Sequence, residues 1–108
     1  MKFNLIMGRH EMPVEENIFD KDIEDVTDVK RMYDIVAEKL KNVKELEVYV
    51  TGLTVALGAV ISYCIDNLIP LTLYHYDRAS DNYYPQVLLS GRQVMYLNYE
   101  NDIHSLNV

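Results

Sequence analysis

A short turn in the middle of the chain carries residue types that suit a bound phosphate. The motif Thr51-Gly52-Leu53-Thr54 follows a predicted strand at residues 46–50 and opens an apolar stretch that runs to about residue 67. Free amides at a helix start and the helix dipole favour an anion, and a glycine lets a ligand approach the backbone. The alternative is an ordinary capped helix after a tight turn, because the chain has neither a full dinucleotide fingerprint nor a P-loop.

Two other segments carry groups for the same chemistry, Gly8-Arg9-His10 and Tyr76-Asp77-Arg78. A guanidinium pairs with phosphate through two parallel hydrogen bonds, so Arg9 and Arg78 are candidate ligands, with Gly8 and Tyr76 beside them. His10 and His75 are candidate acid–base catalysts. Solvated arginines and a packed strand histidine are the alternatives at these positions.

The elements that must position these groups alternate between strand and helix. We predict strands at residues 2–7, 46–50 and 71–76, an amphipathic helix at residues 25–44 capped by Asp25 or Thr27, and a second helix to about residue 67. Residues 77–82 are a predicted turn, and residues 83–89 and 92–99 are predicted strands joined at Ser90-Gly91.

This order predicts one α/β domain over residues 1–108, a minimal Rossmann-like three-layer domain with parallel core strands and a C-terminal β-hairpin. Residues 11–26 are a predicted acidic connection and residues 100–108 a polar tail. Ligands of such sheets bind beyond the carboxyl ends of the parallel strands, where the three candidate segments are expected to meet.

Charge and composition limit the function classes. The chain has 108 residues and a net charge of −7, and residues 11–28 hold eight acidic residues against one lysine, so the remainder is neutral. It has no basic stripe for long DNA or RNA. Cys64, the single cysteine, falls in an apolar helix and is expected in the core, and no spacing suits a metal site. We expect no cofactor, no membrane segment and no signal peptide, and hence a cytoplasmic protein.

The second helix is apolar nearly all round, so it needs cover on most sides. Thr54, Gly58 and Ser62 recur at four-residue steps on one face and permit close approach by another backbone, which suggests a homodimer. Tyrosines gather around the predicted hairpin, where they either stack on bases or pack in strands and interfaces. These tyrosines are Tyr74, Tyr76, Tyr83 and Tyr84.

Two runs of sequence resemble a known family. Residues 48–57, VYVTGLTVAL, are similar to the strand–turn–helix of CARF-type domains. Residues 69–78, IPLTLYHYDR, followed by YYPQ at residues 83–86, resemble small stand-alone Rossmann-like accessory proteins of type III CRISPR systems. The turn departs from the family pattern in having Gly52-Leu53 in place of two glycines.

This resemblance implies a homodimer that binds a cyclic oligoadenylate across its two-fold axis and either sequesters it or cleaves it as a ring nuclease. Such cleavage uses attack by the ribose 2′-hydroxyl and requires no metal. Two alternatives stay open. One is a non-catalytic regulatory or interaction subunit that assembles through the tyrosine-rich hairpin and the small-residue helix face, and the other is a nucleotide binder unrelated to CRISPR.

Overall fold

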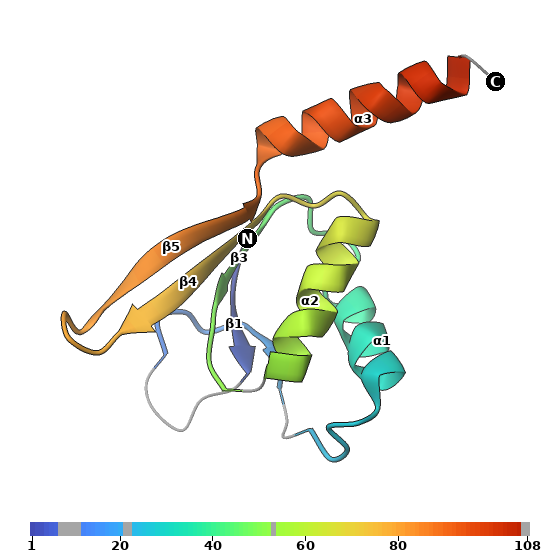
Figure 1. The fold of residues 1–108 in the computed structure, drawn as a ribbon. Coiled ribbons are helices and arrows are strands. Elements are labelled where there is room, and N and C mark those ends of the chain that lie inside the picture. The colour runs from blue at the N-terminus through green and yellow to red at the C-terminus, as the bar shows by residue number, and fades with distance from the viewer. Residues whose placement is uncertain (7–11, 21–22, 53, 107–108) are drawn as a thin grey trace.

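The computed structural model describes residues 1–108 apart from 7–11, 21–22, 53 and 107–108. A five-stranded sheet has the order β2-β1-β3-β4-β5, with only β5 antiparallel to its neighbour (Figure 1). The strands are β1 (Lys2–Ile6), β2 (Asn17–Phe19), β3 (Leu46–Tyr49), β4 (Leu71–Asp77) and β5 (Asn82–Leu89), and the helices are α1 (Val29–Lys39), α2 (Thr54–Asp66) and α3 (Gly91–Leu106). The predicted α/β class, with parallel core strands and a terminal hairpin, is confirmed.

Both crossover helices lie on one face of the sheet. From β2 the chain passes through α1 to β3, and from β3 it passes through α2 to β4, so both crossovers run in the same direction across the sheet. Because such crossovers are right-handed, both helices reach the same face, where α1 and α2 pack against each other. Of the three layers expected, the described residues therefore supply two, the sheet and one helical layer.

The core lies between these two layers. Alternate strand residues point into it, including Phe3, Leu5, Val48, Leu71 and Leu73, all of which are buried. The helical layer contributes Met32 and Val36 from α1 and a buried stripe from α2. That α2 stripe is Ala56, Ala59, Val60, Tyr63 and Cys64.

The first helix begins later and ends earlier than the predicted range of residues 25–44, since α1 runs from Val29 to Lys39. Asp28 is its N-cap and accepts a hydrogen bond from the Arg31 amide at 3.0 Å. The predicted caps, Asp25 and Thr27, instead bond to each other in the preceding turn, at 2.6 Å between the Thr27 hydroxyl and the Asp25 carboxylate. The side chains of all three residues favour both turns and caps, so the sequence alone does not choose among them.

The acidic connection contains a strand that the sequence did not reveal. β2 pairs in parallel with β1, and Asn4 fixes the segment that leads to it. The Asn4 amide, 1% exposed, donates to the Val14 carbonyl at 2.6 Å and to the Asn17 side chain at 3.1 Å. Three residues are too few to show an alternating pattern, so tertiary pairing decided this element.

The predicted strand at residues 92–99 is wrong, because this region forms α3. Ser90 and Gln93 make a capping box, in which the Gln93 amide donates to the Ser90 hydroxyl at 3.0 Å and the Ser90 amide to the Gln93 side chain at 2.8 Å. The hairpin consists of β4 and β5 around the predicted turn. The predicted polar tail from Glu100 also continues the helix, to Leu106.

Candidate functional site

The parallel strands direct their carboxyl ends toward one edge of the sheet, as expected. β1, β3 and β4 all point the same way, so the turn after β3 and the start of α2 lie at this edge. Three of the predicted site residues, Thr51, Gly52 and Thr54, are brought together here. Gly8, Arg9, His10 and Leu53 lie outside the described residues.

The turn that leads into α2 has two features that suit a ligand. Gly52 adopts a φ of +71°, a left-handed conformation that favours glycine, and, its chain neighbours aside, no described residue lies within 4 Å of the position where a Cβ would stand. The Thr51 hydroxyl oxygen is buried and has no hydrogen-bond partner among the described residues. An unpaired buried hydroxyl is destabilising, so this position gains from a partner that the described residues do not supply.

Tyr76, Asp77 and Arg78 lie at the same edge but farther out. Tyr49, the last residue of β3, pairs with Tyr74, and β4 continues past it to Asp77. Arg78 is four residues beyond Tyr74. It therefore lies about 13 Å farther along the strand direction than the last β3–β4 pair, Tyr49 and Tyr74. It is exposed at the tip of the β4–β5 hairpin and so forms a separate part of this edge from the α2 turn.

The hairpin tip is held by its own hydrogen bonds. The Tyr76 hydroxyl donates to the Asp81 carboxylate at 2.5 Å, and the Ser80 hydroxyl donates to Asp77 at 2.8 Å. The bonds from Ser80 and from the Ala79 amide lower the pKa of the Asp77 carboxyl. Because Asp77 is engaged in the turn, Arg78 is the group at this tip that is suited to an anion.

A cluster of four tyrosines covers the sheet face opposite the helices. Tyr49 and Tyr74 stack with ring centroids 5.0 Å apart, Tyr83 meets Tyr49 edge-on at 5.0 Å, and Tyr76 lies 5.5 Å from Tyr83. We call these four residues the tyrosine cluster. It reaches the carboxyl-end edge, because Tyr49 immediately precedes the segment that leads to the α2 turn.

The tyrosine cluster was partly foreseen. Three of the tyrosines predicted around the hairpin belong to it, whereas Tyr84 lies on the helix-side face of the sheet, as its pairing with His75 requires. Tyr49 was missed, although the two-residue alternation of β3 indicates that it faces away from the buried Val48. The Tyr74 hydroxyl donates to Glu47 at 2.9 Å, and this bond raises the pKa of Tyr74. Tyr74 therefore stays neutral.

His75 has a structural role that accounts for its position. Its Nε2 lies 2.7 Å from the Gln86 side-chain oxygen, and its ring lies 5.4 Å from that of Tyr84. It shares a strand face with the buried Leu73, away from the tyrosine cluster. A hydrogen-bonded strand histidine is the reading that these contacts favour, and its predicted catalytic role stays a prediction.

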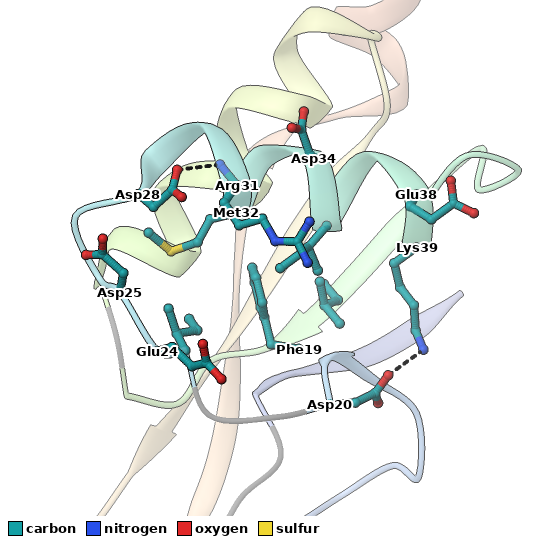
Figure 2. A pocket seen from close by; sticks show the side chains of 13 residues that line it. Phe19, Asp20, Glu24, Asp25, Asp28, Arg31, Met32, Asp34, Glu38 and Lys39 are labelled. Atoms are coloured by element: carbon teal, nitrogen blue, oxygen red, sulfur yellow. Dashed lines mark hydrogen bonds and ion pairs between the residues drawn. The ribbon is translucent and has the colours of Figure 1, made fainter.

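A cavity of about 930 Å³ lies between α1 and the segment that follows β2, and the sequence analysis did not anticipate it. Figure 2 shows Phe19 and Met32 within it, with Arg31 reaching across and the Lys39–Asp20 ion pair, 3.2 Å long, at one end. The cavity is lined by more carboxylates than cations, and its two cations are Arg31 and Lys39. The carboxylate residues are Asp20, Glu24, Asp25, Asp28, Asp34 and Glu38. Such a cavity repels phosphate, so an anionic ligand is favoured on the β3–β4 side of the sheet edge.

Other chemistries find little support in the described residues. Cys64 is buried, and this burial raises the pKa of its thiol to about 12, which keeps it protonated and unreactive. No group of three or more His, Cys, Asp or Glu residues in the described ranges is arranged to hold a metal ion. Nor is any described helix both long and apolar enough to cross a membrane.

Comparison with known proteins leaves the geometry as the basis for a functional assignment. No family model, curated protein or solved structure matches this chain.

Proposed function

We propose that this protein binds a cyclic oligoadenylate at the carboxyl-end edge of its sheet, as a homodimer, and either sequesters the ring or cleaves it. One observation carries the proposal. The left-handed Gly52 turn and the Thr51 hydroxyl, which has no partner among the described residues, follow Tyr49 of the tyrosine cluster by three and two residues, respectively, at the same sheet edge. A nucleotide needs both kinds of surface, polar donors for its phosphate and aromatic rings for its base.

The phosphate is assigned to the α2 turn. The first amides of a helix have no partners within the helix, and the dipole attracts negative charge. The open space at Gly52 allows a phosphate to approach these amides. The Thr51 hydroxyl, which nothing in the described chain holds, reaches such a ligand by rotation about χ1.

The adenines are assigned to the tyrosine cluster. Stacking of a base on an aromatic side chain contributes about 1–3 kcal/mol, and it does not require a basic protein. Tyr76 is exposed at the outer end of the cluster, next to the hairpin tip that carries Arg78. A cyclic oligoadenylate repeats the same phosphate and adenine groups around its ring. A homodimer repeats the α2 turn and the tyrosine cluster once in each copy, so each copy can bind an equivalent part of the ring.

Cleavage, where it occurs, follows from the substrate's own chemistry. The ribose 2′-hydroxyl loses its proton and attacks the adjacent phosphorus, and the 5′-oxygen leaves with a proton to give a 2′,3′-cyclic phosphate. The protein aligns the groups and stabilises the charge on the phosphate. His10 and His75 are the candidate proton carriers, and the Gln86 bond orients the ring of His75.

Calorimetry with cyclic tri-, tetra- and hexa-adenylate tests binding, with AMP and linear oligoadenylate as controls. Saturable binding of one ring and weaker binding of the controls would support the proposal. Absence of binding by all three rings would refute it, and equal binding of AMP would favour a general nucleotide site. Chromatography of the bound ring after incubation then separates sequestration, which leaves the ring intact, from cleavage, which produces linear products.

A second candidate function is a non-catalytic interaction subunit. The observation in its favour is that Thr54, Gly58 and Ser62 are all exposed on α2, and that no other part of the described chain comes within 4 Å of the position of a Cβ at Gly58. A flat face of small residues beside Val55 and Ile65 suits close packing against another helix. Gly58→Leu would abolish assembly through this face while leaving nucleotide binding intact.

A further inference from the structure

The last helix has no partner within the described chain. α3 has 16 residues, about 24 Å of helix, and packs extensively against none of the other described elements. Figure 1 shows it leaving the end of β5 and running away from the body of the protein. The radius of gyration is 15.3 Å, against about 13 Å for a compact chain of this length. An isolated helix of this size is marginal in water, so α3 needs a surface to pack on.

The connection to β5 holds α3 away from its own sheet. Ser90 is the only residue between the two elements, and the reciprocal Ser90–Gln93 bonds fix the direction in which the helix starts. To fold back over its own sheet, the chain would have to break this capping box and unwind the first turn. The surface that receives α3 therefore belongs to another molecule.

One side of α3 carries a stripe of exposed apolar and aromatic side chains. Met95, Tyr96 and Tyr99 lie at three- and four-residue steps and are 73%, 62% and 63% exposed. Arg92 precedes them on the same side of the helix. Val94 and Leu97, on the opposite side, are less exposed, so the apolar stripe faces outward.

A matching surface lies on the same chain, at the amino-end half of the uncovered sheet face. A hollow of about 410 Å³ there is lined by the carboxylate residues Glu45 and Glu47 and by Thr72 and Val87, and it lies beside the start of the chain's own α3, since Ser90 and Gly91 also line it. Val87 is 60% exposed. The carboxylates of Glu45 and Glu47 complement Arg92, and the exposed side chain of Val87 offers an apolar contact to Met95. The tyrosine cluster borders the hollow through the Tyr74–Glu47 hydrogen bond and extends from there toward the carboxyl-end edge.

We propose that two copies of this chain exchange their α3 helices, each packing its Arg92–Tyr99 stripe into the hollow of the other's sheet. The exchange covers the sheet face opposite α1 and α2 with a helix. The helix that covers it is α3 of the other copy, which has no extensive contact within its own described chain. It deepens the proposed function by identifying the interface of the homodimer.

The area available is sufficient for this exchange. A stable interface buries about 1,200–2,000 Å² in total, so each of the four surfaces supplies about 300–500 Å². Fully covered aromatic side chains bury about 150–250 Å² each, so Tyr96 and Tyr99 together contribute about 200–300 Å². Met95 and the stem of Arg92 supply the remainder.

Light scattering of the full chain without ligand, over a concentration series, tests the exchange. We expect twice the chain mass of 12.6 kDa. The helix variant Met95→Glu/Tyr99→Glu places two carboxylates against Glu45 and Glu47, and the sheet variant Val87→Arg places a cation against Arg92. Each is expected to be monomeric, whereas Leu97→Glu, on the other side of α3, stays dimeric. Circular dichroism of each variant checks that it is folded, so that a monomeric result reports on the interface.

Mixing the two variants gives the decisive result. The helix variant keeps an intact sheet face and the sheet variant keeps an intact α3, so one of the two contacts can form between them. Differently tagged variants should form a heterodimer that is at least tenfold weaker than the native dimer, because only one contact remains. Helix-to-helix pairing would leave Val87→Arg dimeric and would give no such complementation.

A monomeric native protein, a dimer that survives either variant, or a mixture that stays monomeric would overturn the exchange. These results are independent of nucleotide binding. A monomer that binds a cyclic oligoadenylate defeats the exchange alone, and a dimer that binds none of the rings defeats the proposed function alone.

Discussion

Replacing Thr51 by valine separates the role of this residue in folding from its role in binding. Valine has nearly the shape of threonine but lacks the hydroxyl, which is buried without a partner among the described residues. A buried unpaired polar group is unfavourable by about 1–3 kcal/mol. Because the Thr51 residue as a whole is only half-buried, we expect the lower end of this range, a gain of about 1 kcal/mol in the free energy of unfolding.

The same substitution is expected to weaken ligand binding. A hydrogen bond to a charged phosphate contributes about 1.5–3 kcal/mol, so loss of the hydroxyl raises the Kd about 10- to 150-fold. Thermal unfolding and calorimetry measure the two effects. A gain of 1 kcal/mol raises Tm by about 4–8 °C in a domain of this size. Thr51→Ser, which keeps the hydroxyl, is the matched control and should bind normally.

For Thr51→Val, the reasoning requires that the Tm rises while the affinity for the ligand falls. A lower Tm for Thr51→Val would mean that the hydroxyl has a partner in the folded chain, and the argument from an unsatisfied group would fail. A higher Tm with unchanged affinity would remove Thr51 from the ligand site while leaving the structural argument intact.

Further predictions concern the hairpin tip, the core and the edge strand. Arg78→Ala should weaken ring binding by about 1.5–3 kcal/mol in calorimetry, whereas Lys44→Ala should not; equal affinities would exclude Arg78 as a phosphate ligand. Cys64, whose pKa is raised to about 12, should not react with a thiol reagent at pH 8 until urea unfolds the chain, and a fast reaction in the native state would contradict its burial. Asn4→Ala should lower the free energy of unfolding by about 1–2 kcal/mol in urea, because the Val14 carbonyl loses its donor while the buried Asn4 Oδ1, which has no partner among the described residues, is removed as well; a change near zero would show that water replaces the amide. The pKa of Asp77 lies below its ordinary value of 3.8, so its turn bonds stabilise the hairpin above that pH and are lost as the pH falls through the lower folded-state value. An NMR titration of the carboxyl that gave an ordinary pKa would contradict these bonds.

Local patterns in the sequence were sufficient for most of the elements. The three- and four-residue spacing of Met32, Val36 and Leu40 predicts α1, and the alternation of Leu71 and Leu73 predicts β4. The order of these elements then implies the parallel core and the common edge that holds the α2 turn. The region after β5 was predicted wrongly because Val94, Tyr96 and Leu97 are compatible with a strand, while the capping box of Ser90 and Gln93 determines the helix.

The sequence by itself determined the α/β class, the parallel core and the position of Thr51 and Gly52 at the start of α2, because these follow from periodicity and connection order. Tertiary structure alone decided that Tyr49 joins the hairpin tyrosines, that Arg78 projects beyond the α2 turn, and that one sheet face and α3 are left uncovered. These features depend on strand register and on the direction in which a one-residue link points a helix. Register is set by contacts between distant residues, which no local pattern encodes, and the direction of α3 has an effect only relative to the sheet that those contacts build.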